Sequence, residues 1–198
     1  MMKRRDLLKM IAAATGTAFV SSNVLAYTIM PMLDSKDSGY SKDDVAFFNE
    51  VGESIIPRTD TPGSKDANVG SIMAILLADC YSPAQRKAFN DGIVSIKLKA
   101  KTRYAKDFLL LTPEQRLALL SSLDEEANIH NKKKGLGETH IIDDGLDLPH
   151  YFSIIKQLVL FSFFSSEVGA TKVLRYVANP GSYDGNLPYK KGDKAWAT

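Results

Sequence analysis

The sequence predicts an all-α protein, with a compact single-domain helical bundle over residues 41–178 and an extended tail over 179–198. Apolar residues recur at three- and four-residue steps along the bundle region, and one helix-start pattern occurs twice within it. No segment of four to eight residues alternates convincingly between apolar and polar side chains, as a strand would. With 198 residues, 44% of them hydrophobic, the chain can bury one sizeable core.

The first predicted helix begins after Ser41, a helix-capping residue, and is stopped by Pro57. Apolar residues at helical spacing form its inward face: Val45, Phe48, Val51 and Ile55. Two prolines and a glycine make 57–63 a loop. A short apolar helix is expected next, over about Val69–Cys80.

Two long helices follow, each opened by a hydroxyl cap, a proline and a glutamine three residues after the cap, at 82–85 and 112–115. The predicted inward stripe of the first is Phe89, Ile93, Ile96, Ala100 and Tyr104. That of the second is Leu117, Leu120, Leu123 and Ala127. Three lysines and a glycine at 132–135 end the second helix, because positive charge and a left-handed glycine both suit a helix C-terminus.

The most hydrophobic predicted helix begins at Pro149 and is expected at the centre of the bundle. Apolar residues cover nearly its whole circumference: Tyr151, Phe152, Ile154, Ile155, Leu158, Val159 and Phe161. The apolar run is only about 14 residues long and contains Lys156 and Gln157. It therefore predicts a core helix and no membrane span.

A last helix is predicted to restart at Ser165, to run through Leu174 and Val177, and to end before Asn179. The tail beyond it has no helical period but carries large side chains, which we predict as partner-interface residues: Tyr183, Leu187, Pro188, Tyr189 and Trp196. An extended segment cannot bury such groups by itself. Either they fold back over the helices or they lie in a partner's groove, and the sequence leaves both readings open.

Residues 1–26 have the three parts of an export signal: a basic section, a short apolar section and small residues before a cleavage site. The basic section fits the twin-arginine pattern, with Arg4, Arg5, Leu7, Leu8 and Lys9 at the required places. Threonine and glycine dilute the apolar section, which favours the twin-arginine route for folded cargo over the general secretory route. We expect cleavage after Ala26, a linker over 27–40 and a periplasmic location.

Charge and cysteine content exclude several classes of function. The whole chain has a net charge of +2, and the signal alone has +3, so residues 27–198 have a net charge near −1. They lack the excess of positive charge that is typical of nucleic-acid binding. Cys80 is the single cysteine, which excludes an intrachain disulfide, a cysteine-based zinc or iron–sulfur site and covalently attached haem. In its apolar helix Cys80 is expected to be a small core residue rather than a nucleophile.

The remaining candidate sites are weak, and we assign no catalytic, cofactor-binding or metal-binding residue. The glycines of 135–140 start like a dinucleotide fingerprint but lack the third glycine and follow a helix instead of a strand. A cluster of histidines and aspartates lacks metal-site spacing, and surface carboxylates around a turn explain it better: His130, His140, His150, Asp143, Asp144 and Asp147. Glu167 could be buried and catalytic, although a first-turn carboxylate is the favoured reading.

Four segments, in the right order, resemble the small subunit of gluconate 2-dehydrogenase-type enzymes: Ile55–Ala67, Phe163–Ala170, Pro180–Gly185 and Gly192–Trp196. The family also has a twin-arginine signal in front. One departure is Ser64, where an alanine is usual after Pro-Gly.

The resemblance implies a non-catalytic partner of a periplasmic, FAD-dependent dehydrogenase of sugars or sugar acids. In such complexes the large subunit, a flavoprotein of the glucose-methanol-choline oxidoreductase type, holds the FAD, oxidises the substrate and often passes electrons to a c-type cytochrome. Because the large subunit commonly lacks a signal of its own, the small subunit is thought to bind it in the cytoplasm and escort it through the twin-arginine translocase. The complex would also connect the chain to the inner membrane.

Two alternatives stay open. The chain could donate a residue to the edge of the partner's substrate cleft. It could instead be a free-standing periplasmic binding or metal-dependent protein that uses the loop from His140 to Asp147.

Overall fold

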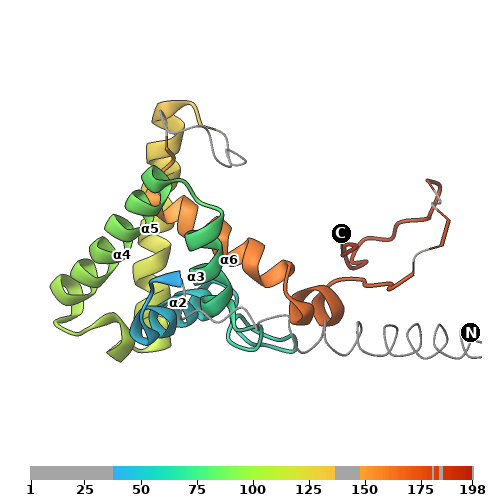
Figure 1. Cartoon of the computed structure of the whole chain (residues 1–198), viewed down its shortest axis with the longest axis horizontal. Helices are drawn as coiled ribbons and strands as arrows, with labels where there is room; N and C mark the ends of the chain where they lie inside the picture. The colour runs from blue at the N-terminus through green and yellow to red at the C-terminus, as the bar shows by residue number, and fades with distance from the viewer. Residues whose placement is uncertain (1–37, 137–147, 180, 183–184, 198) are drawn as a thin grey trace, which may run out of the picture. The chain divides into compact units, whose positions relative to one another are not determined.

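The computed structural model describes residues 38–136, 148–179, 181–182 and 185–197 (Figure 1). The predicted signal and most of the predicted linker lie outside these ranges. The described chain is all-α, as predicted, with helices α2 (Lys42–Ile55), α3 (Val69–Asp79), α4 (Pro83–Tyr104), α5 (Pro113–Lys134) and α6 (Tyr151–Phe164), and the short turns η2 (Phe108–Leu110) and η3 (Gly169–Val173). None of the described helices has the length and apolar character that crossing a bilayer requires.

Local capping interactions start three of the helices where the sequence predicts. Ser41, Ser82 and Thr112 each accept a hydrogen bond from the backbone N–H three residues later, and the side chain of that residue accepts one in return. These reciprocal bonds satisfy two N–H groups that a helix N-terminus otherwise leaves without a partner. Gly135 ends α5 in the left-handed conformation, as the sequence also predicts.

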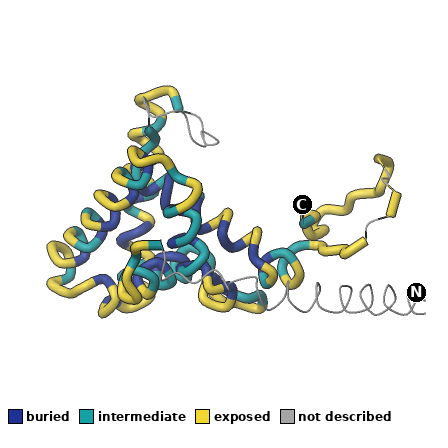
Figure 2. Tube along the Cα trace, in the orientation of Figure 1, coloured by how far each residue is buried: buried dark blue, intermediate teal, exposed yellow. Residues whose placement is uncertain are grey.

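Helix α6 is the central element, because it packs against α2, α3, α4 and α5. Its inner side chains join one apolar core with residues from every described α-helix (dark blue in Figure 2). Phe47, Phe48, Phe89 and Phe108 lie within that core as a chain of edge-on and tilted ring contacts. Gly92 lets α4 approach α6, since a Cβ there would lie 2.5 Å from the Tyr151 ring.

The predicted inward face of α5 is wrong at one position. Leu117 is 55% exposed, whereas Leu119 is buried together with Leu120, Leu123 and Ala127. Arg116 takes the inward place one turn before Leu120, and its side chain is only 13% exposed. A pattern of apolar residues cannot identify a charged side chain that turns inward. The pattern therefore predicts Leu117 as the inward residue instead of Arg116.

Arg116 turns inward because Glu50 on α2 and two backbone carbonyls receive it. Its guanidinium forms an ion pair with Glu50 and donates to the carbonyl oxygens of Phe108 at 3.2 Å and Leu109 at 2.7 Å. The Glu50 carboxylate also accepts a bond of 2.5 Å from Lys65 Nζ. This cluster therefore connects α2 with α5, with η2 and with the loop after α2.

Helix α6 begins at Tyr151, two residues after the predicted start at Pro149. His150 caps the helix, and its Nδ1 accepts a hydrogen bond of 3.3 Å from the N–H of Phe152. Asn131 of α5 holds the cap in place by accepting the N–H of His150 at 3.0 Å. Burial first, and the nearby His130 second, lower the pKa of His150.

The last predicted helix is much shorter than expected. It ends at Val173 with one wide turn, in which the N–H of Leu174 bonds to the carbonyl of Gly169 at 3.1 Å, and it does not reach Val177. Only glycine fits at position 169, because a Cβ there would lie 2.0 Å from the carbonyl oxygen of Phe163. Beyond this end, Arg175 pairs its backbone with Ala195 and Ala197.

Replacing Arg116 with alanine should lower the free energy of unfolding by about 2–3 kcal/mol, because the change leaves the Glu50 carboxylate with Lys65 as its remaining partner and removes the donor to two carbonyls. Urea unfolding followed by circular dichroism measures the loss. The matched control is Lys87→Ala, which removes an exposed ion pair with Asp91 and should cost less than about 0.5 kcal/mol. Equal losses in the two variants would contradict the role given to Arg116.

Stability should fall as the pH is lowered below about 6.5, and His150 should account for part of the fall. Because the folded pKa of His150 is lowered, the unfolded chain binds its proton first, and the stabilisation present above pH 6.5 is lost as the pH falls through the folded pKa. Urea unfolding at pH 7.5, 6.5 and 5.5 measures the slope. His150→Asn keeps a capping oxygen without a titratable group, so its slope should be shallower; an unchanged slope would refute this assignment.

Candidate partner-binding surface

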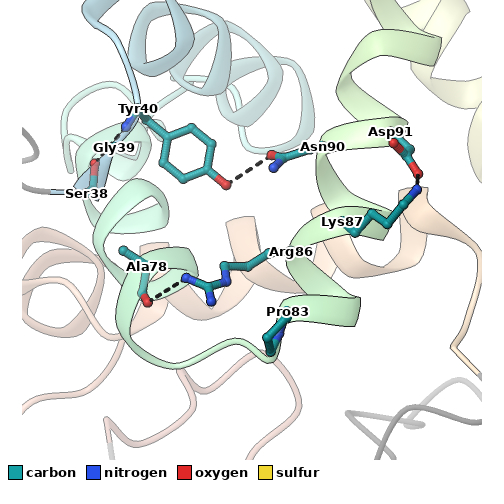
Figure 3. A pocket seen from close by; sticks show the side chains of 9 residues that line it. All are labelled: Ser38, Gly39, Tyr40, Ala78, Pro83, Arg86, Lys87, Asn90 and Asp91. Carbon is teal, nitrogen blue, oxygen red and sulfur yellow. Dashed lines mark hydrogen bonds and ion pairs between the residues drawn. The ribbon is translucent and has the colours of Figure 1, made fainter.

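A hollow of about 590 Å³ lies between the start of α2, the end of α3 and the first half of α4 (Figure 3). Its polar side chains bond to one another or to backbone: Tyr40 donates to Asn90 at 3.0 Å, Arg86 to the carbonyl of Ala78 at 3.2 Å, and Lys87 to Asp91 at 2.6 Å. Its nine lining residues include no histidine, cysteine or glutamate. The three polar contacts each join two lining residues, so they fix the walls of the hollow.

The histidine and aspartate cluster of the sequence is only partly described. The rings of His130 and His150 lie 5.5 Å apart, with His150 engaged as the cap of α6. His140, Asp143, Asp144 and Asp147 lie outside the described residues. Within the ranges that the structure describes, no three histidine, cysteine, aspartate or glutamate side chains come together as metal ligands would.

Two other candidate residues lie at the surface. Cys80 is exposed, so its expected place in the core is wrong. Helix α3 ends at Asp79, and Cys80 starts the bend that leads to the cap at Ser82. Glu167 is also exposed, on the short turn after α6, which removes the basis for a buried catalytic carboxylate there.

The segment 55–67, one of the four resembling blocks, is a polar loop fastened to α2. Glu53 accepts the backbone N–H groups of Arg58 and Lys65, each at 2.9 Å, and Asp66 accepts the N–H of Gly63 at 2.8 Å. Ser64 is fully buried and donates to the carbonyl of Gly52 at 2.9 Å. An alanine at 64 would fit the same space without that bond, so the departure at this position keeps the loop geometry.

An apolar face of α6 is left uncovered by the rest of the described chain. In its last two turns one face holds the buried Leu158, Val159 and Phe163. The opposite face holds three exposed side chains, which we call the α6 outer face: Leu160, Phe161 and Phe164. Phe161, predicted as buried, is 58% exposed. A helix that is apolar on every side is expected to be buried on every side. The rest of the described chain covers only one side of the last two turns of α6.

The C-terminal arm, residues 175–197, carries a second set of exposed apolar side chains (Figure 2). They are Tyr176, Val177, Leu187, Tyr189 and Trp196. Pro188 is exposed as well, whereas Tyr183 lies outside the described residues. The Arg175 guanidinium lies over the ring of Trp196, and 44% of that residue remains exposed. The partner contact of Trp196 stays a prediction.

Sequence reasoning missed the α6 outer face and the role of Arg175. Phe161 and Phe164 were hidden in an all-apolar helix, where spacing gives no signal of which face a partner covers. Arg175 gave no signal either, since its partner Trp196 is distant in the sequence and the pairing depends on the path of the arm. Exposed apolar groups gathered on a helix face and an arm are typical of protein–protein contacts.

Comparison with known proteins identifies the family. The family model described as gluconate 2-dehydrogenase subunit 3 matches residues 42–181, from the first residue of α2 to the beginning of the arm. No curated protein and no solved structure is significantly similar to the chain. The matched part contains every described α-helix, the polar loop and the α6 outer face. The chain therefore belongs to the gluconate 2-dehydrogenase subunit 3 family.

Proposed function

We propose that this chain is the non-catalytic small subunit of a periplasmic, FAD-dependent dehydrogenase of a sugar or sugar acid. In this role it binds the flavoprotein large subunit, stabilises it and escorts it through the twin-arginine translocase. The large subunit holds the FAD and passes the electrons to a c-type cytochrome, and the complex attaches the chain to the inner membrane. Family membership is the observation that carries the proposal, since the family is named for a subunit of such an enzyme.

The α6 outer face supports the binding part of this proposal. Leu160, Phe161 and Phe164 are large apolar groups held on a rigid helix whose other side is packed into the core. Burial of one such side chain in an interface contributes about 1.5–3 kcal/mol, so three of them can anchor a stable contact. Aromatic anchors at the centre of an apolar patch suit a permanent subunit interface better than a transient one.

The signal supports the escort part. Arg4 and Arg5 begin a twin-arginine pattern, and that route carries proteins that have already folded. A flavoprotein must fold around FAD before export, so a signal on a tightly bound partner solves the problem of how it leaves the cytoplasm. The helices of this chain start from local caps, which favours rapid folding before translocation.

Exchanging one exposed phenylalanine tests the binding surface. Phe161→Ser should leave the free energy of unfolding within about 0.5 kcal/mol of the wild type, but it should reduce the flavoprotein recovered with the tagged chain. The matched variant Phe163→Ser changes a side chain that is 1% exposed and should cost about 3–5 kcal/mol. Undiminished recovery with Phe161→Ser would exclude the α6 outer face as the contact.

Exchanging the arginine pair tests the escort. With Arg4→Lys and Arg5→Lys together, both this chain and the flavoprotein should stay in the cytoplasm, because the translocase no longer recognises the signal. Dye-linked dehydrogenase activity in the periplasmic and cytoplasmic fractions measures the distribution. Phe161→Ser is the matched control, since the chain itself should still be exported while the flavoprotein is left behind. Periplasmic flavoprotein activity without this chain would reject the escort role.

A further inference from the structure

The C-terminal arm is closed into a loop by contacts between its two ends. The N–H of Arg175 donates to the carbonyl of Ala195 at 2.8 Å, and the N–H of Ala197 donates to the carbonyl of Arg175 at 3.0 Å. The Arg175 guanidinium lies over the Trp196 ring, 4.0 Å from its centroid. Lys194 adds a bond of 3.1 Å to the carbonyl of Lys172, on the turn η3. These contacts join the end of the chain to the point where the arm leaves the helices.

We infer that Arg175 and Trp196 form a clasp that closes the arm before the partner binds, so that the arm presents a preformed basic and aromatic turn, Lys190–Asp193 with Tyr189 before it, to an acidic surface of the flavoprotein subunit. This inference rests on the proposed function. It gives Trp196 a positioning role within its own chain, in place of the direct partner contact that the sequence predicts.

The clasp matters because an open arm would lose much of its conformational freedom on binding. Ordering a flexible segment of about 20 residues is unfavourable, and closing it beforehand removes part of that cost from the binding step. A guanidinium stacked on an indole is the strongest common cation–π pair in proteins. Two backbone bonds beside it fix the register in which the ring meets the guanidinium.

A tight turn lies just before the clasp residue Trp196. Lys190 and Asp193 bracket this turn, with the N–H of Asp193 donating to the carbonyl of Lys190 at 3.0 Å. The Asp193 carboxylate accepts the N–H of Lys190 at 2.8 Å, and Gly192 takes a φ of +98° that other residues avoid. The turn holds Lys190 and Lys191 next to Tyr189, which is 78% exposed.

The charge of the arm indicates which kind of partner surface the Lys190–Asp193 turn would bind. The described part of the arm carries four cationic side chains: Arg175, Lys190, Lys191 and Lys194. Its described acidic residue, Asp193, is engaged within the turn. A partner surface with carboxylates around an apolar pocket would pair with Lys190 and Lys191 while receiving Leu187 and Tyr189. Such pairing increases the association rate and makes it depend on salt.

A double-mutant cycle on the full chain tests the clasp, using the FAD-loaded flavoprotein that co-purifies with it. Arg175→Met removes the cation and keeps the length of the side chain, and Trp196→Leu removes the ring. Each variant should weaken binding about two- to fivefold, and the double variant should lose no more than either alone, since both changes open the same contact. Arg175→Lys should restore part of the affinity.

Fluorescence of the free chain gives a readout that partner binding does not affect. Trp196 is the only tryptophan, so its emission and its quenching by acrylamide report the state of the clasp directly. In the absence of the flavoprotein, Arg175→Met should increase the quenching of Trp196. Unchanged quenching would show that the clasp does not form in the free chain and would overturn the inference.

The binding results separate this inference from the proposed function. If the wild-type chain binds no flavoprotein, the proposed function fails, and the inference fails with it. If the wild type binds and only Trp196→Leu weakens binding, Trp196 touches the partner itself and the clasp is refuted. If all the arm variants bind like the wild type, the arm is not part of the contact, while the proposed function stands.

The lysine pair tests the chemistry of the partner surface. Lys190→Gln with Lys191→Gln should lower the association rate and flatten its dependence on salt, whereas the control pair Lys132→Gln with Lys133→Gln, at the end of α5, should not. Vesicles of phosphatidylcholine with one quarter phosphatidylglycerol distinguish a lipid surface. Vesicle binding that needs Lys190 and Lys191, together with unchanged flavoprotein binding, would overturn the assignment to an acidic protein surface.

Discussion

Glu50 is the group on which the arrangement of this fold most depends. Its carboxylate, on α2, receives Arg116 from α5 and Lys65 from the polar loop, and Arg116 at the same time holds two carbonyls of η2. Arg116 and Glu50 are only 13% and 21% exposed, so each charge needs the other. Apolar packing alone would let α5 slide or rotate against α2, whereas this cluster allows one register.

The polar loop extends the same constraint outward. Glu53, one turn after Glu50, holds the loop backbone at Arg58 and Lys65, and Ser64 fixes it to the end of α2 from within. One helix thus organises the core through its apolar face and the loop through its carboxylates. This division leaves α6 free to place one face in the core, while the α6 outer face, with Phe161 as its most exposed residue, stays uncovered by the rest of the described chain.

The parts of the fold that sequence predicts well are those decided by neighbours along the chain. The caps at Ser41, Ser82 and Thr112, the loop after Pro57 and the glycine at the end of α5 all depend on residues within one helical turn. The failures lie where distant contacts decide. Arg116 turns inward because of Glu50, a residue far away in the sequence, and Phe161 faces outward because nothing in the described chain covers that side of α6.

The candidate surface follows the same rule. Large apolar residues in a tail without helical period predict side chains that the tail cannot bury by itself, and Leu187 and Tyr189 are exposed. The closure of the arm through Arg175 and Trp196 could not be predicted, because it depends on η3 ending the helix early at Val173. Sequence pattern thus identifies which segments have exposed chemistry, and the backbone path determines how they present it.

The exposed thiol of Cys80 has a practical consequence for studying the arm. Cys80 directly follows α3, and Trp196 lies near the end of the arm. Each is the only residue of its type in the sequence. A dye attached to this thiol would accept energy from the indole without any engineered substitution. The native chain thus provides its own spectroscopic ruler for following how the arm moves against the helices during assembly.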